Sequence, residues 1–351
     1  MNQEVIRIMF RLQYLHIRMP FIEKNGRRKR GNKNLMKKRR LGNTGLEIAP
    51  FVLGGNVFGW TVREETAFNL LDAFVGAGFN LIDTADVYST WVAGHSGGES
   101  ETIIGQWLKR RSNRRKVLIA TKVGLPMGPG RQGLSKAYIQ AEVEESLKRL
   151  QTDYIDLYQA HADDPGSTLD ETLDAFETLI KQGKVRAIGA SNYSSRRLVR
   201  ALEISGYKGF TGYQTLQPRY NLYDREEYER EFEPLVKEKG LGVITYSSLA
   251  SGFLSGKYRY CEDLAVRARG PMVSKYLNER GFRILKALDE AAQKMGAKPA
   301  TIALAWLMAR NSVTAPIASA TSIEQLDELI KAASLELDRS VIAFLDEASA
   351  Y

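Results

Sequence analysis

The chain has 351 residues, of which 44% are hydrophobic, so it is long enough to bury a substantial core in one domain or two. Its single cysteine, Cys261, excludes an intramolecular disulfide, which is compatible with a reducing compartment, and no apolar run is long enough to span a membrane. A formal charge of +9 spread over the fold would indicate a nucleic-acid or acidic-membrane partner. The charge is not spread, because residues 1–40 hold 13 of the 50 basic and 2 of the 41 acidic residues. The rest of the chain has 37 basic and 39 acidic residues.

The N-terminal tail, residues 1–35, carries the basic excess and has three interpretations. A targeting segment is the first, although the tail lacks the uninterrupted apolar centre of a secretory signal and the serine content of a transit peptide. A basic arm that binds an acidic surface is the second. We favour the third, a disordered extension or a misassigned upstream start, which leaves residues 36–351 as the folded domain. No nucleic-acid partner is predicted for that domain.

From Leu46 onward, short apolar runs alternate with helical patterns. Runs typical of buried strands are residues 51–53, 79–82, 117–120, 155–158, 185–188, 213–216, 241–245 and 313–317. Helical patterns include residues 64–75, 99–108, 136–150, 169–180 and 226–239, with 282–293 and 299–308 after the seventh run. The polar stretch 258–280 is either a long loop or partly helical. About eight repeats of strand and helix predict an α/β fold, a parallel (β/α)8 TIM barrel.

Three consecutive predicted strands end in polar side chains. The second run stops at Asp83, and a short loop leads from it to Tyr88; the third ends at Lys122 and the fourth at His161. Each residue alone has an ordinary explanation as a turn former, a solvated cation or a packing residue. Because parallel strands bring their carboxyl ends to one face, where α/β proteins keep their sites, we expect the four side chains to lie together.

In the contexts LIDTADVY, IATKVG and LYQAH, these residues resemble the catalytic tetrad of the aldo-keto reductases, in the family's order and near its spacing. The segments GKVRAIGASN, YSSLASGFLSGKY and PIASATSIEQL resemble further family motifs. The resemblance runs from about Arg40 to the C-terminus, and Met36 lies where family members often begin. It implies a cytoplasmic oxidoreductase that uses NADP(H), or NAD(H), to reduce an aldehyde or ketone to an alcohol.

The resemblance gives the four side chains their roles in carbonyl reduction. Tyr88 would donate the proton to the carbonyl oxygen. Lys122, as an ammonium close to the phenol, would lower the pKa of Tyr88 by about 1–3 units, and Asp83 would keep Lys122 charged and oriented. His161 would hydrogen-bond the substrate oxygen as a neutral imidazole.

The resemblance also implies where the dinucleotide binds, since no G-x-G-x-x-G fingerprint follows a strand. Tyr246 would stack on the nicotinamide, whose carboxamide would be held by Ser191, Asn192 and Gln214. The pyrophosphate would lie against Ser247, Leu249, Ser251, Gly252 and Lys257. The ribose side would be lined by Gly55, Asn56 and Val57, and Asp83 would also contribute to the cofactor site.

The adenosine end departs from the commoner family pattern. Many relatives carry an Arg or Lys there that pairs with the 2′-phosphate, and often an Asn that meets the adenine. This chain instead has Ser319, Thr321, Ser322 and Gln325, with Leu329 where the Asn is often found. A helix beginning near Ile323 could still receive a phosphate at its N-terminus. Because a charge-assisted hydrogen bond is worth about 1.5–3 kcal/mol, we expect NADPH to be preferred over NADH by about tenfold or less.

The substrate pocket is predicted from aromatic residues in loops on the same face. Trp60, Trp91 and Val92, with His161, would enclose a moderately apolar carbonyl compound, and His95 lies on a glycine-rich rim. No metal site is predicted. Two other functions stay open: a lyase that forms a Schiff base on Lys122, and a non-enzymatic regulatory subunit that binds the cofactor, since barrels with this resemblance also serve as channel-associated subunits.

Overall fold

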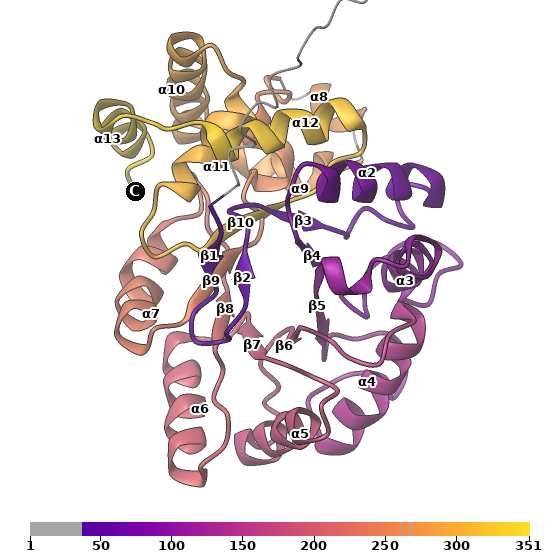
Figure 1. Ribbon diagram of the computed structural model, residues 1–351. Helices are drawn as coiled ribbons and strands as arrows, with labels where there is room; N and C mark the ends of the chain where they lie inside the picture. The colour runs from indigo at the N-terminus through magenta and orange to yellow at the C-terminus, as the bar shows by residue number, and fades with distance from the viewer. Residues whose placement is uncertain (1–36, 261, 267) are drawn as a thin grey trace, which may run out of the picture. The chain divides into compact units, whose positions relative to one another are not determined.

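The computed structural model describes residues 37–260, 262–266 and 268–351, and in them eight parallel strands close into a barrel (Figure 1). Around the barrel the strands are β3 (Val52–Gly54), β4 (Leu81–Asp83), β5 (Leu118–Val123), β6 (Leu157–Ala160), β7 (Ile188–Ser191), β8 (Thr215–Gln217), β9 (Gly242–Thr245) and β10 (Ala315–Ala318). The last strand pairs in parallel with the first, β10 with β3, which closes the ring. The predicted (β/α)8 TIM barrel is therefore confirmed.

Two sequence predictions fall outside the described residues. The first is that residues 1–35 form an extension outside the folded domain, and the second is that Cys261 forms no intramolecular disulfide. The start of the folded domain at Met36 stays a prediction. None of the helices in the described ranges is long and apolar enough to cross a membrane.

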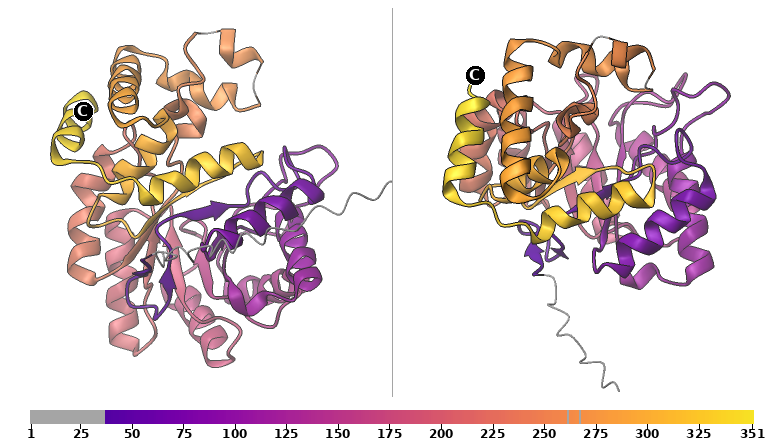
Figure 2. Two further views of the ribbon diagram at one scale, coloured as in Figure 1. Left: turned by 45° about the horizontal axis from the view of Figure 1, so that its top comes forward. Right: turned by 90° about the horizontal axis from the view of Figure 1, so that it is seen from above.

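Helices pack around the barrel and connect its strands (Figure 2). Each of the barrel strands β3 to β7 is followed by one α-helix. In order these helices are α2 (Glu64–Gly76), α3 (Glu99–Arg111), α4 (Lys136–Leu150), α5 (Leu169–Lys181) and α6 (Ser195–Lys208). The C-terminal half contributes α7 (Glu233–Lys239), α10 (Glu279–Met295), α11 (Pro299–Met308), α12 (Ile323–Lys331) and α13 (Arg339–Ala348). Side-chain oxygens accept a free backbone N–H at the start of several of these helices, from Ser135, Thr168, Ser194, Asn278, Ser322 and Asp338.

The predicted strands begin one to three residues too early, whereas α4 and α11 have the predicted bounds. The apolar runs start before the hydrogen-bonded ladder does. Phe51 and Phe79 precede β3 and β4, and their rings pack edge to face at 5.7 Å, with Phe74 of α2 against both. These residues are apolar because they fill the core next to the strands.

The predicted helix 226–239 is divided in the structure. It opens with a π-helical segment, η2 (Tyr228–Phe232), and continues as α7. Pro234 lies in the first turn of α7 and has no N–H to donate to the preceding turn, which accounts for the change of pitch.

A short hairpin that the sequence did not reveal closes the amino end of the barrel. Its strands β1 (Arg39–Arg40) and β2 (Glu47–Ile48) are antiparallel. Leu41, Leu46 and Ile48 are buried against side chains that line the barrel. Gly42 turns here with φ +52°, and a Cβ at this position would lie 2.2 Å from the backbone nitrogen of Gly242, so only glycine fits.

The polar stretch 258–280 is partly helical, which decides between the two alternatives left by the sequence. It contains α8 (Glu262–Ala265), α9 (Gly270–Val273) and η4 (Ser274–Tyr276). Tyr276 fixes the end of the stretch, because its ring stacks on Phe253 at 5.4 Å and its hydroxyl donates to Asp224 at 2.7 Å.

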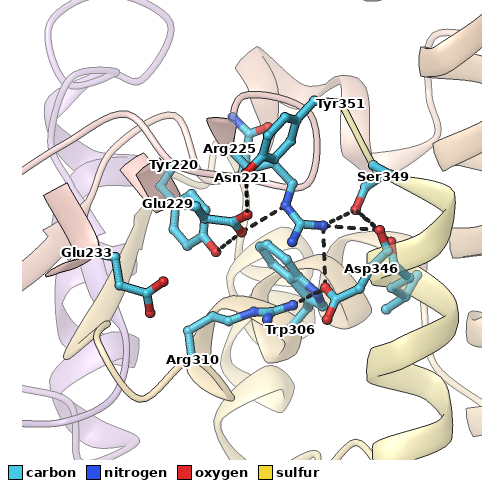
Figure 3. Close-up of polar contacts among 12 residues, drawn as sticks. Tyr220, Asn221, Arg225, Glu229, Glu233, Trp306, Arg310, Asp346, Ser349 and Tyr351 are labelled. Atoms are coloured by element: carbon cyan, nitrogen blue, oxygen red, sulfur yellow. Dashed lines mark hydrogen bonds and ion pairs between the residues drawn. The ribbon is translucent and has the colours of Figure 1, made fainter. Parts of the chain in front are cut away.

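A buried arginine ties the C-terminal helix to the barrel (Figure 3). Arg225 donates to Ser349 Oγ at 2.6 Å and lies over the Trp306 ring at 5.2 Å. Arg310 lies over the same ring at 4.0 Å and forms an ion pair with Asp346 of α13. Trp306 in turn donates from its indole nitrogen to Asp346 at 2.9 Å. The guanidinium groups and the indole thus join α11 and α13.

Candidate active site

The four side chains expected together do meet at the carboxyl ends of β4, β5 and β6. Asp83 is the last residue of β4, Lys122 lies in β5, and His161 directly follows β6. Lys122 Nζ donates to Asp83 Oδ2 at 2.7 Å, to the Thr84 carbonyl at 2.8 Å and to the Tyr88 hydroxyl oxygen at 2.8 Å. One ammonium therefore joins the carboxylate to the phenol.

Burial makes this ion pair a fixed part of the site. Lys122 is fully buried and Asp83 is 2% exposed. Burial alone would lower the pKa of Lys122, but the charge of Asp83 and the oxygen of Tyr88 outweigh it, and the net pKa is raised. Lys122 is consequently a cation at neutral pH.

The pKa of Tyr88 differs from the sequence prediction. Burial raises the pKa of this phenol to about 12; the charge of Lys122 lowers it, and the carboxylate of Asp83 raises it again. The expected net lowering was wrong, because the sequence showed the cation but not the depth of burial of the phenol. At neutral pH Tyr88 therefore keeps its proton and is an O–H donor.

His161 is an uncharged ring beside the phenol. Burial and the nearby charge of Lys122 both lower its pKa well below the ordinary 6.5. Its ring meets that of Tyr88 edge to face, with centroids 6.0 Å apart. Nδ1 of His161 has no hydrogen-bond partner in the described part of the chain, whereas the backbone carbonyl accepts from Asn192 Nδ2 at 2.8 Å.

The tetrad borders a cavity of about 1070 Å³ at the carboxyl end of the barrel. Asp83, Tyr88 and His161 line it, while Lys122 lies behind them. The predicted residues that also line it are Asn56, Val57, Trp60, Trp91, Ser191, Asn192, Tyr246, Ser247, Leu249, Ser251, Gly252, Lys257, Ser319, Thr321 and Gln325. Gly55 does not reach it: its N–H donates to the Asp83 carbonyl at 2.7 Å, and its carbonyl accepts from Ser100 at 2.8 Å.

The prediction for Gln214 is wrong. Its amide donates to the Asn43 carbonyl in the hairpin turn at the amino end of the barrel, at 2.9 Å. Gln217, three residues later, ends β8 on the correct face and lines the cavity. Its Nε2 donates to Asp83 Oδ1 at 2.8 Å and lies 3.3 Å from Gln159 Oε1. Gln217 therefore occupies the position that was assigned to Gln214.

Hydroxyl and amide groups on β7 and after β9 form a connected set in the middle of the cavity. The Tyr246 hydroxyl donates to Asn192 Oδ1 at 2.8 Å, and Asn192 Nδ2 lies 3.1 Å from Ser191 Oγ. Ser191 Oγ donates to the Gln217 carbonyl at 2.9 Å. Arg219 stands beside this set, 5.7 Å from the centroid of the Tyr246 ring.

The loop after β9 has an unusual backbone. Ser247, Ala250, Ser251 and Gly252 all have positive φ, between +48° and +97°. Such stretches turn backbone N–H groups toward one side and are typical of anion-binding loops. Lys257 lines the same part of the cavity, and a Cβ at Gly252 would come within 2.9 Å of its Cε.

The end of the cavity near α12 is polar but not free of basic groups. Ser319 donates to Asn56 Oδ1 at 2.5 Å, and Thr321 donates to Gln325 Oε1 from its N–H at 3.0 Å. Lys298, at the start of α11, also lines this end and forms an ion pair with Glu328 at 3.9 Å. The prediction for this end considered only the segment after β10 and missed Lys298, a lysine supplied by another helix.

Aromatic rings line the cavity next to the tetrad. Trp60 and Trp91 pack edge to face at 5.7 Å, and Trp91 lies 6.1 Å from the Tyr88 ring. Arg269, from the stretch before α9, lies over the Trp60 ring at 5.6 Å. Val92, expected beside Trp91, does not border the cavity; Val266 and Met272 do.

Several lining residues were missed by sequence reasoning: Gln217, Arg219, Ser248, Lys298 and Arg269. Gln217 could have been found from its position just before Pro218, because proline marks the end of the strand. Lys298 and Arg269 lie in helical or irregular segments far along the chain, and nothing in their local sequence indicates that they face the site.

The chain resembles known proteins over almost all of the described barrel. The sequence model described as "Aldo/keto reductase family" matches residues 50–350. The "Uncharacterized oxidoreductase YrpG" of Bacillus subtilis is 38% identical over 315 residues, covering 88% of this chain and 94% of the relative. "Protein tas" of Escherichia coli is 32% identical over 340 residues, covering 89% and 97%. A rice protein named "Probable voltage-gated potassium channel subunit beta" is 32% identical over 305 residues, covering 85% and 91%.

Proposed function

Because this chain belongs to the aldo/keto reductase family, we propose that it is an oxidoreductase that reduces an aldehyde or ketone to an alcohol with NADPH, or with NADH, and that Tyr88 is the general acid. The observation that carries the proposal is the buried Asp83–Lys122–Tyr88 set beside a neutral His161, at the wall of one large cavity. The names of two relatives, an oxidoreductase and the norsolorinic acid reductase of Aspergillus flavus, support the reaction class.

The cavity fits a nicotinamide dinucleotide together with a small substrate. Its volume of about 1070 Å³ is slightly above the roughly 300–1,000 Å³ of ligand pockets. Tyr246 offers an aromatic face, Asn192 and Gln217 offer amides, and the loop around Gly252 with Lys257 suits a pyrophosphate. The bound nicotinamide would supply the hydride.

Each residue of the tetrad then has one task. Tyr88, protonated because burial raises its pKa to about 12, would donate its proton to the carbonyl oxygen as negative charge develops there. A developing alkoxide is a stronger base than a phenolate, so the transfer is favourable even from a weakly acidic phenol. Lys122 would stabilise the phenolate that remains, and neutral His161 would position the oxygen by a hydrogen bond.

The alternative of a Schiff-base lyase is disfavoured by the surroundings of Lys122. An amine must be unprotonated and accessible to attack a carbonyl. Lys122 is fully buried, donates three hydrogen bonds and has a raised pKa. A regulatory subunit is the second candidate, because the rice relative is named as a channel subunit; an intact tetrad favours the enzyme.

We further propose NADPH as the preferred cofactor, by about tenfold or less over NADH. Thr321 and Gln325 can donate hydrogen bonds to a phosphate, but Lys298, the lysine that the described residues place at that end, is 72% exposed and shared with Glu328. An exposed, shared cation contributes little to affinity.

The deciding experiment follows cofactor absorbance with a panel of aldehydes, ketones and sugars, using NADPH and NADH in parallel. We expect turnover with at least one class of carbonyl and a ratio of kcat/KM between the cofactors near or below ten. Binding of NADPH without turnover of any carbonyl would favour the regulatory subunit. A substrate adduct trapped by borohydride, in the absence of nicotinamide, would favour the lyase.

A further inference from the structure

Arg269 lies at the aromatic end of the cavity, and no carboxylate in the described part of the chain pairs with it. Its guanidinium lies over the Trp60 ring, 5.6 Å from the centroid, and the side chain lines the same cavity as Tyr88 and His161. Within the described residues it forms no ion pair. Burial lowers its pKa, but a guanidinium stays charged at neutral pH.

Two other cations at the cavity wall differ from Arg269 in this respect, whereas Arg219 and Lys257 line the cavity beside the Tyr246 ring and in the segment after β9. Lys275 pairs with Asp224 at 3.5 Å, and Lys298 pairs with Glu328 at 3.9 Å. A partly buried charge without a counter-ion has lost part of its hydration without compensation, so an anion that reaches it from the cavity is favoured. Among these three cations, Arg269 is the one best placed to bind an anion.

The surroundings of Arg269 indicate the ligand it would meet. Trp60 and Trp91 form an aromatic wall that leads from Arg269 to the Tyr88 ring. Met272 and Val266, 57% and 79% exposed, add apolar surface at the same end.

We propose that Arg269 is a specificity-determining residue that binds a carboxylate on the substrate. The substrates of this site are then flat, mainly apolar carbonyl compounds with a carboxylate at the end away from the carbonyl group. The rings of Trp60 and Trp91 contact the apolar middle, and the tetrad takes the carbonyl. This inference rests on the proposed function, because it needs the carbonyl to lie at Tyr88.

The test compares two aldehydes of the same shape, 4-formylbenzoate and its methyl ester, which differ in charge at the far end. The full chain is compared with Arg269→Gln, Arg269→Lys and Lys286→Gln. Lys286 is exposed on α10 and does not border the cavity, so its loss changes the net charge by the same amount as Arg269→Gln. For each protein we measure kcat/KM for both aldehydes, calorimetric binding of 4-formylbenzoate to the NADPH-loaded protein, and NADPH affinity.

A lost charge-assisted contact should lower the ratio of kcat/KM, benzoate over ester, about ten- to a hundredfold in Arg269→Gln. In the same variant, binding of 4-formylbenzoate should weaken by the same factor, and NADPH affinity should be unchanged. Lys286→Gln should give the same values as the unchanged chain. Arg269→Lys should recover part of the ratio, since it restores the charge but not the planar fork.

Two results would overturn the proposal. One is an unchanged ratio and unchanged binding of 4-formylbenzoate in Arg269→Gln. The other is a loss of NADPH affinity with both aldehydes equally affected, which would assign Arg269 to the cofactor. If the unchanged chain reduces neither these aldehydes nor the wider panel, the proposed function fails, and the calorimetric comparison still decides whether Arg269 binds the carboxylate.

Discussion

Tyr88 keeps its proton because burial outweighs the charge of Lys122, so removing the hydroxyl should remove the acid alone. For Tyr88→Phe we expect turnover to fall by roughly 10²–10⁴, with NADPH affinity unchanged. Tyr158→Phe is the matched control, because the buried hydroxyl of Tyr158 has no hydrogen-bond partner among the described residues. Steady-state rates and fluorescence titration with NADPH measure both effects. Normal turnover in Tyr88→Phe would refute the assignment.

His161 provides a second test, because its low pKa links stability to pH. In the unfolded chain this imidazole has its ordinary pKa near 6.5, whereas in the folded chain the pKa is well below that value. Between the two pKa values only the unfolded chain binds the proton, so the stability contributed by neutral His161 is present above about pH 6.5 and is lost as the pH falls toward the folded pKa.

The change can be measured against His161→Asn, which does not titrate. From pH 7.5 to 5.5, the free energy of unfolding of the unchanged chain should fall relative to the variant by about 1.4 kcal/mol. Urea unfolding at the two pH values gives both numbers, and the remaining titratable groups cancel in the difference. Parallel pH dependence of the two proteins would mean that folding does not lower the pKa of His161.

Gln217 and Gln214 form a natural pair for a third test. Gln217→Leu leaves Asp83 Oδ1 without its 2.8 Å donor and removes an amide from the cavity. We expect NADPH affinity to fall by roughly tenfold or more, because a buried carboxylate oxygen loses its partner. Gln214→Leu removes a contact to the hairpin turn at the other end of the barrel and should leave NADPH affinity within about twofold. Equal losses in the two variants would contradict the corrected assignment.

These two glutamines also show what the sequence could and could not predict about the site. The tetrad residues follow apolar runs that mark their strands, so their common face was predictable. Within YQTLQP the resemblance was carried onto the first of two glutamines, Gln214, whereas the strand ends at the second, Gln217, so only Gln217 reaches the cavity. Lys298 and Arg269 reach the cavity through tertiary packing, for which the local sequence carries no signal.

At the scale of elements, helices were delimited better than strands, for a physical reason. A helix is started by a local cap, and Ser135 and Thr168 stand directly before α4 and α5, which begin where predicted. A strand is delimited by its partners, which are distant in sequence. The hairpin β1–β2 was missed because its strands are two residues each and are stabilised by Leu41 and Ile48 packing into the barrel end.

The C-terminal helix offers a prediction about stability. Arg225 is 8% exposed and connects Glu229, at 2.8 Å, with Ser349. For Arg225→Met we expect a loss of about 3–5 kcal/mol, because buried oxygens lose their donor. The control is Arg230→Met, whose side chain is 64% exposed in its pair with Glu226 and should matter by at most about 1 kcal/mol. Urea unfolding of the two variants measures both losses of stability. Similar losses in Arg225→Met and Arg230→Met would show that the buried contacts of Arg225 stabilise the fold no more than an exposed ion pair does.

On the scale of the whole molecule, the barrel separates stability from function. The amino end is closed by the β1–β2 hairpin and a buried apolar cluster, whereas the carboxyl end carries the tetrad and the cavity. Every residue to which we assign a role in the site lies between Asn56 and Gln325. Most of the formal positive charge is carried by a different stretch of the sequence, residues 1–35, which hold nine basic and two acidic residues.

That separation predicts that a shortened chain starting at Met36 folds and reduces carbonyls as the full chain does, with the same kcat/KM within about twofold. The two chains should differ in charge, because residues 36–351 hold 41 basic and 39 acidic residues, a formal charge of +2 against +9. The full chain should therefore be retained more strongly on a cation-exchange column, and salt should remove the difference. Circular dichroism and the carbonyl assay test the first part. If the shortened chain fails to fold or loses activity, then residues 1–35 belong to the barrel's structure, and the boundary proposed at Met36 is wrong.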